Sequence, residues 1–145
     1  MDNSRFNKAS LRYAIAHEIY GHAMQLSYWN KFIKEGIINE ICGCEEDYGP
    51  EIIQLEGVGE SIVYFIFKDE IDLEMEVELL LDKLHHLVQN NSYIMFNSGY
   101  PLEECVNYYC ENYILGDREF VKKRILLSKE DSFYRANLYS YGSSL

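Results

Sequence analysis

The chain has 145 residues and a mass of 17.1 kDa, the size of one ordinary domain. Hydrophobic residues make up 48% of it, which is enough to build a core and excludes a disordered chain. The 24 acidic and 13 basic residues leave a formal charge of −11, which disfavours binding to nucleic acid or to an anionic membrane.

The hydrophobic pattern predicts helices along the whole chain. From Leu11 to Phe32 apolar residues recur three to five positions apart, and Ser10 is the candidate N-cap of this helix. The stretch 61–67 has the composition of a strand, but its continuity with the preceding residues favours helix. The predicted helices cover 11–34, 51–68, 69–89, 101–113, 118–128 and 131–141, with loops over 36–50 and 90–100. The sequence therefore predicts an all-α fold, a compact single-domain helical array over residues 1–145.

The compartment is indicated by what the sequence lacks. The first ten residues are polar, without the apolar core of a secretory signal, and no apolar run is long enough to span a bilayer. The four cysteines form no recognisable disulfide framework. We therefore expect a cytoplasmic protein with reduced thiols.

The first predicted helix carries the motif HExxxH, from His17 to His22. Histidine nitrogens are usual zinc ligands, and an adjacent glutamate can act as a general base. In the familiar HExxH motif the histidines share one helix face, but five positions apart on a regular helix they diverge by about 140°. Convergence requires a π-bulge, for which Gly21 is well placed. The motif alone fits two surface histidines beside an exposed Glu18 equally well.

A second predicted helix offers a carboxylate to such a site. Glu56 supplies the third ligand that a two-histidine zinc site requires. Glu60, one turn later on the same face, can accept the free ring N–H of a ligating histidine. Gly57 and Gly59 are small enough to let the two helices approach closely, although they are also compatible with a loop before a strand.

With both segments considered together, the chain resembles the gluzincin metallopeptidases. It is similar to the bacterial family called domain of unknown function 885, marked by HExxPGH and a later EGW. It is also similar to the tyrosine carboxypeptidases that act on microtubule tails, marked by HEIxxH and EEGLA, and more distantly to the carboxypeptidase Taq family. The likeness extends from His17 to Gly142 and is carried by HEIYGHAMQ, LEGVGESIVYFIFKDE, GYPLEECVNYYCEN and RANLYSYG.

The resemblance implies a zinc-dependent peptidase that binds one zinc per chain and acts on a peptide or protein. It implies that His17, His22 and Glu56 hold the metal, that Glu18 is the general base and that Glu60 supports a ligating histidine.

The closing element of the resemblance implies a donor to the oxyanion. This role falls to Tyr139, with Tyr134 and Arg135 as nearby substitutes.

The chain also departs from these families. They have a long region before the HE helix that builds much of the substrate cleft, whereas here the motif begins at His17. Val58 stands in place of the EGW tryptophan, and 93–98 contains no histidine. We therefore expect the metal ligands to be kept and the substrate machinery to be reduced, and a partner chain that completes the cleft is one alternative.

The rival hypothesis is a non-catalytic helical module, in which a zinc ion holds the helices together or the acidic surface binds a partner. A structural zinc takes four protein ligands, so a fourth from His85, His86 or a cysteine favours this role, whereas an open position favours an enzyme. Two histidines and a carboxylate also suit iron, manganese or cobalt.

Other candidate metal ligands have simpler interpretations. His85 and His86 point about 100° apart on a helix and are expected to be a partly buried pair. Cys42 and Cys44 are expected to be free thiols in a loop. Cys105 and Cys110 are expected to belong to the core.

Overall fold

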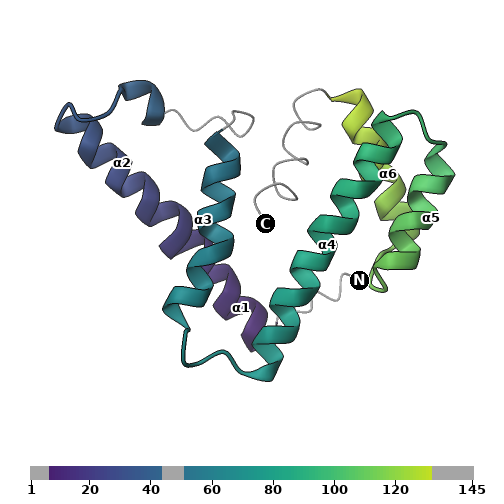
Figure 1. Ribbon diagram of the computed structural model, residues 1–145, viewed down its shortest axis with the longest axis horizontal. Coiled ribbons are helices and arrows are strands. Elements are labelled where there is room, and N and C mark those ends of the chain that lie inside the picture. Colours follow the sequence, from purple (N-terminus) through teal and green to yellow (C-terminus); the bar gives the residue numbers. More distant parts are fainter. Residues whose placement is uncertain (1–6, 44–50, 132–145) are drawn as a thin grey trace. The chain divides into compact units, whose positions relative to one another are not determined.

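The computed structural model describes residues 7–43 and 51–131, and every regular element within these ranges is a helix (Figure 1). The all-α prediction is therefore confirmed. Across the described ranges, no helix combines the length and apolar character needed to cross a membrane. The elements are α1 (Lys8–Ile15), the π-helix η1 (Ala16–Ala23), α2 (Met24–Lys34), the 3-10 helix η2 (Glu40–Gly43), α3 (Glu51–Ile66), α4 (Leu73–Asn97), α5 (Leu102–Asn112) and α6 (Arg118–Glu130).

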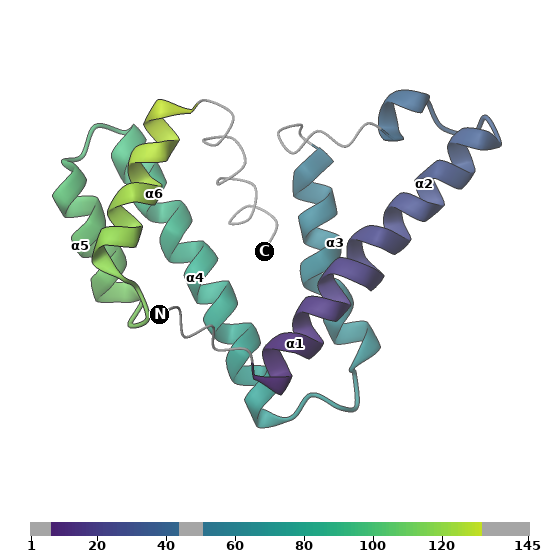
Figure 2. The same ribbon diagram turned by 180° about the vertical axis from the view of Figure 1, so that it is seen from behind.

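The chain forms two compact units, residues 1–80 and 81–145, and the boundary falls inside α4. In the first unit α1, η1 and α2 make one uninterrupted helix, which crosses α3 at η1 (Figures 1 and 2). The buried core of this unit consists of Ala9, Ala16, Val63, Met75 and Leu79. Because α1 and α3 share this core, it fixes the helices on which the predicted site residues lie.

The start of α1 differs from the prediction. Its N-cap is Asn7, whose Oδ1 accepts a hydrogen bond from the backbone N–H of Ser10 at 2.7 Å. Ser10 was the expected cap, but it lies inside the first turn. An asparagine side chain at the N-cap accepts a hydrogen bond from the free backbone N–H groups of the first turn as well as a serine side chain does. Because Asn7 is in the extended conformation of an N-cap, the helix begins one turn earlier than predicted.

The turn after α3 is held against α1 by Arg12. Its guanidinium lies over the ring of Phe67, 4.6 Å from the centroid, and donates a hydrogen bond to the carbonyl oxygen of Glu70 at 2.9 Å. The carboxylate of Asp72 lies 3.5 Å away. These contacts tie the C-terminal end of α3 to the helix that carries the HExxxH motif.

The second unit is built from α4, α5 and α6. Its buried core consists of Val88, Tyr93, Cys105, Val106, Tyr109, Val121 and Ile125. The predicted loop 90–100 is wrong for most of its length, because α4 continues to Asn97. Burial of Ser92 and Tyr93 in this unit offsets the weak helix propensity of the local sequence, and α4 is followed by Gly99 at φ 95°.

The other helices are close to their predicted positions. The stretch 61–66 is helical and belongs to α3, and α5 and α6 agree with the predictions to within two residues. The predicted helix over 131–141 lies outside the described residues, apart from Asp131, which caps α6.

The two histidines of α4 are partly buried, as expected. The Nδ1 atom of His85 lies 2.6 Å from the hydroxyl of Tyr109, and His86 Nε2 lies 3.4 Å from a carboxylate oxygen of Asp82. Burial, reinforced by neighbouring His86, lowers the pKa of His85 to about 4. His85 is therefore neutral at pH 7, and its Nδ1 shares a hydrogen bond with the hydroxyl of Tyr109.

This depressed pKa predicts acid destabilisation. Between pH 6.5 and 4 the unfolded state binds a proton at His85 that the folded state does not, so stability falls as the pH falls through this window. We expect His85 to contribute a loss of about 2–3 kcal/mol, measured by urea unfolding at pH 7 and pH 4.5. The variant His85→Gln keeps a group that can hydrogen-bond to Tyr109 and should lose most of this pH dependence. If the wild type and His85→Gln lose the same free energy of unfolding between pH 7 and pH 4.5, His85 is not the source of the acid destabilisation.

Candidate metal centre

The HExxxH motif lies in η1, an eight-residue π-helix. A π-helix makes i→i+5 hydrogen bonds, so residues five positions apart share one face. His17 and His22 are such a pair, with ring centroids 4.6 Å apart and Nε2 atoms 3.0 Å apart. The predicted π distortion is therefore confirmed, and it extends over more than one bulged residue.

Helix α3 brings Glu56 to the same point. Its Oε2 atom lies 3.4 Å from His17 Nε2 and 3.8 Å from His22 Nε2. Together with the 3.0 Å between the two nitrogens, these distances form a triangle of three ligand atoms. Zinc ligands about 2.0–2.1 Å from a tetrahedral ion are separated from one another by about 3.3 Å. The triangle therefore has the size that a tetrahedral metal requires.

The burial of Glu56 also fits a cation. The residue is 4% exposed, and within the described part of the chain its Oε2 accepts no hydrogen bond. A buried carboxylate oxygen without a donor is costly, and a metal ion between the carboxylate and the two imidazoles removes that cost. The donor set of two imidazoles and one carboxylate is common to zinc and related divalent ions.

Two glycines allow η1 and α3 to approach closely enough for these ligands to meet. A Cβ atom on Gly21 would lie 2.7 Å from the Cα of Gly59, and a Cβ on Gly59 would lie 2.7–3.0 Å from ring atoms of His17. Real Cβ atoms do not make such contacts. The expected role of Gly59 is therefore confirmed, and Gly21 has the same role on the facing helix.

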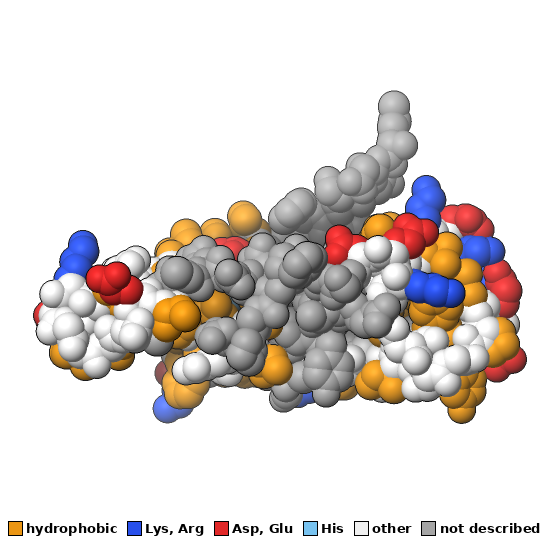
Figure 3. All heavy atoms as spheres, turned by 90° about the horizontal axis from the view of Figure 1, so that it is seen from above, with side chains coloured by type: hydrophobic (Ala, Val, Ile, Leu, Met, Phe, Trp, Pro, Cys, Tyr) orange, Lys and Arg blue, Asp and Glu red, His pale blue; other side chains and the backbone are white. Residues whose placement is uncertain are grey.

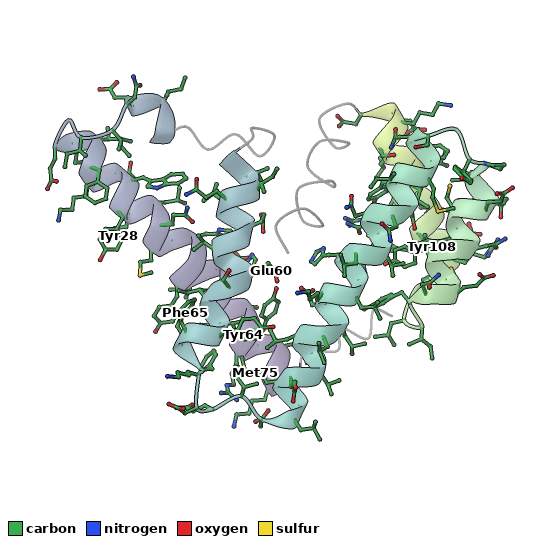
Figure 4. All side chains as sticks on the ribbon, in the orientation of Figure 1. Tyr28, Glu60, Tyr64, Phe65, Met75 and Tyr108 are labelled. Carbon is green, nitrogen blue, oxygen red and sulfur yellow. The ribbon has the colours of Figure 1, made fainter. Side chains whose placement is uncertain are left out.

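Glu60 lies beside the other ring nitrogen of His17. Its Oε1 is 3.6 Å from His17 Nδ1 and accepts a hydrogen bond from the hydroxyl of Tyr13 at 2.8 Å. Ligating histidines usually direct their second nitrogen toward a carboxylate, which fixes the ring. Glu60, which Figure 4 shows on α3, thus lies beside the histidine that it was predicted to support.

Tyr13 was not predicted as part of the site. Its ring packs against His17 with centroids 5.8 Å apart, and its hydroxyl holds Glu60. The sequence feature that could have identified Tyr13 is its position four residues before His17, which places both residues on one face of the helix. Tyrosine is so frequent in this chain that the spacing alone did not distinguish it.

The neighbouring carboxylates determine the charge of His17 in the metal-free chain. Burial lowers the pKa of His17, but Glu56, Glu60 and Glu18 together raise it further, so it lies above its usual value. A metal needs the neutral imidazole, so protons compete with the metal more strongly here than at an isolated histidine.

The predicted general base, oxyanion donors and cysteines lie in different environments, and some lie outside the described residues. Glu18 is exposed at the surface of η1. Tyr134, Arg135 and Tyr139 lie outside the described residues, as do the side chains of Cys42 and Cys44. Cys105 is buried in the second unit and Cys110 is half-buried, both as free thiols, in agreement with a core role.

An open hollow of about 670 Å³ runs along α2 in the first unit. It begins at Ala23, directly after His22 in the chain. Its described lining combines polar and apolar surface and consists of Ala23, Leu26, Ser27, Asn30, Lys31, Lys34 and Glu35.

Comparison with known proteins does not place the chain in a family. A scan against protein-family models found no match, and searches of curated proteins and of solved structures found no match either. The resemblance to the gluzincin metallopeptidases therefore rests on the motifs.

Proposed function

We propose that this chain is a zinc-dependent peptidase in which His17, His22 and Glu56 hold one zinc ion. The observation that carries the proposal is the triangle of ligand atoms between η1 and α3, with edges of 3.0, 3.4 and 3.8 Å. The resemblance of HEIYGHAMQ and LEGVGESIVYFIFKDE to the metal-binding segments of the gluzincins supports it.

The number of ligands favours a catalytic role over a structural one. Among the described residues this ligand group has three members, whereas a structural zinc takes four protein ligands. A zinc ion with an open fourth position polarises a carbonyl and lowers the pKa of water. Glu18 follows His17 directly and is exposed, so its carboxylate can take a proton from water and return it to the leaving amine.

The surface beside the site is compatible with an extended peptide. The hollow along α2 starts at Ala23, one residue after His22 in the chain, and offers polar side chains and two lysines over its length. A peptide backbone needs hydrogen-bond partners of this kind. These features support a peptide or protein substrate, and they do not discriminate between internal and terminal cleavage.

The proposal is tested by metal analysis and by a cleavage assay. Purified untagged protein, offered zinc and then freed of excess metal, should retain about one zinc per chain by mass spectrometry. The variant Glu18→Gln should retain the zinc but lose at least about a hundredfold of the activity on a peptide library.

Each outcome has a definite meaning. If the wild-type chain retains no metal, the proposal is wrong. If zinc is retained but the wild type cleaves no peptide, the rival hypothesis of a metal-stabilised interaction module is favoured. Measurement of iron, manganese and cobalt in the same sample identifies the metal.

A further inference from the structure

Tyr13 lies four residues before His17 on the helix that carries the HExxxH motif. Its ring packs against the imidazole of His17, with centroids 5.8 Å apart. Its hydroxyl donates a hydrogen bond of 2.8 Å to Oε1 of Glu60, which lies on α3. Tyr13 therefore contacts both the first histidine of the motif and the carboxylate beside that histidine, and it does so within the first unit.

The carboxylate of Glu60 is largely withdrawn from solvent. Acidic side chains reach the surface on the face of the molecule that Figure 3 shows, whereas the side chain of Glu60 is 14% exposed. A carboxylate that leaves water needs hydrogen bonds from the protein in place of those that it loses. The hydroxyl of Tyr13 supplies such a bond, so it stabilises the Glu60 carboxylate at this position.

The ring of His17 has one nitrogen for the metal and one for this carboxylate. Its Nε2 atom is a corner of the ligand triangle, which leaves Nδ1 for a supporting contact. Within the described part of the chain Nδ1 is buried without a hydrogen bond, and Glu60 Oε1 lies 3.6 Å from it. A neutral imidazole that binds a metal through Nε2 carries its proton on Nδ1, and this N–H needs an acceptor. The oxygen that Tyr13 holds is in place to be that acceptor.

We propose that Tyr13 is a positioning residue of the metal centre, whose hydroxyl fixes Glu60 so that Glu60 in turn fixes the ring of His17 for zinc. This inference rests on the proposed function, because it requires that His17 binds the metal through Nε2. An ionised carboxylate oxygen has two acceptor sites, so Oε1 can accept the Tyr13 O–H and the His17 N–H together. The phenol can only donate to such an oxygen, and Glu60 therefore stays an acceptor toward His17.

A role in packing alone leads to a different expectation. If the ring of Tyr13 only filled the space beside His17, its hydroxyl would be dispensable for zinc binding. The variant Tyr13→Phe separates the two roles, because it keeps the ring and removes the hydroxyl. The matched control is Tyr28→Phe, which removes the hydroxyl of a tyrosine on α2 that is 53% exposed and should leave the zinc affinity unchanged.

The test is a double-mutant cycle on the zinc affinity of the full chain, measured by titration against a competing chelator. Tyr13→Phe should weaken zinc binding about tenfold and Glu60→Ala about 10–100-fold, as expected for residues that support a metal ligand. The double variant should bind zinc as Glu60→Ala does, to within about threefold, because the hydroxyl acts through the carboxylate. A packing residue would instead give losses that multiply.

Two further measurements show that the variants are folded. Helicity by circular dichroism of the metal-free chain should be the same in the wild type, Tyr13→Phe and Tyr28→Phe. A second cycle with Glu60→Gln, which keeps the volume of the side chain, replaces Glu60→Ala if that variant does not fold.

The outcomes distinguish this inference from the proposed function. If the wild type binds zinc and Tyr13→Phe binds it equally tightly, the positioning role is wrong and the proposed function stands. Losses that multiply in the cycle also overturn the role, since Tyr13 then acts independently of Glu60. If the wild type binds no zinc, the proposed function fails and the positioning role fails with it.

Discussion

Replacement of Glu56 by alanine is expected to weaken zinc binding by more than about a hundredfold. The loss of a residue that only supports a metal ligand costs 10–100-fold in affinity, and Glu56 would contribute a ligand atom itself. Its Oε2 lies 3.4 and 3.8 Å from the two histidine nitrogens, and among the described residues the ligand group has no fourth member to replace it. Titration with zinc against a competing chelator measures the change.

Two control variants test whether the loss of zinc affinity comes from the loss of the Glu56 ligand. Glu74→Gln removes an exposed carboxylate from α4 and should leave zinc affinity unchanged. Glu56→Gln keeps the volume of the side chain and should also bind zinc poorly, because a neutral amide is a weaker ligand than a carboxylate. If Glu56→Ala binds zinc as tightly as the wild type does, the ligand triangle has been assigned incorrectly.

Replacement of Gly21 by alanine is expected to destabilise the first unit by about 1–3 kcal/mol and to abolish tight zinc binding. The added methyl group would lie 2.7 Å from the Cα of Gly59. Backbone atoms cannot rotate away as a side chain can, so η1 and α3 must separate, and Glu56 moves away from His17. The gain in helix propensity, about 1 kcal/mol, opposes this cost without removing it.

Urea unfolding and zinc titration test this expectation together. Ser27→Ala on α2 changes an exposed residue to alanine and provides the helix-propensity control without crowding. Gly59→Ala should behave like Gly21→Ala, because its methyl group would overlap the ring of His17. An unchanged or raised stability in both glycine variants would show that the two helices are not in close contact at this point.

The sequence was sufficient to predict the three residues that the structure brings together. The five-residue interval between His17 and His22 predicted a π distortion, since only that geometry aligns them. Glu56 was predicted because the ligand set was incomplete without a carboxylate. That these residues bind zinc stays a prediction.

Features that depend on packing between distant segments were not predictable in this way. Asn90 to Ser92 have the composition of a loop, but α4 continues through them because Ser92 and Tyr93 are buried against α5 and α6. The contribution of Tyr13 depends on where α3 places Glu60. The local sequence contains neither of these constraints.

The π-helix also affects how the length of this protein can change during evolution. The eight-residue π-helix contains both histidines, and its i→i+5 hydrogen bonds match the five-residue interval between them. Deletion of one residue between them would restore an ordinary α-helix and the spacing of HExxH, and both histidines would still share a face. If the lost residue is Ile19, the deletion also returns Ile15 and Tyr20, now five apart, to the four-residue spacing of one helical face. At this point the helix can therefore lose a residue without rotating the segments on either side.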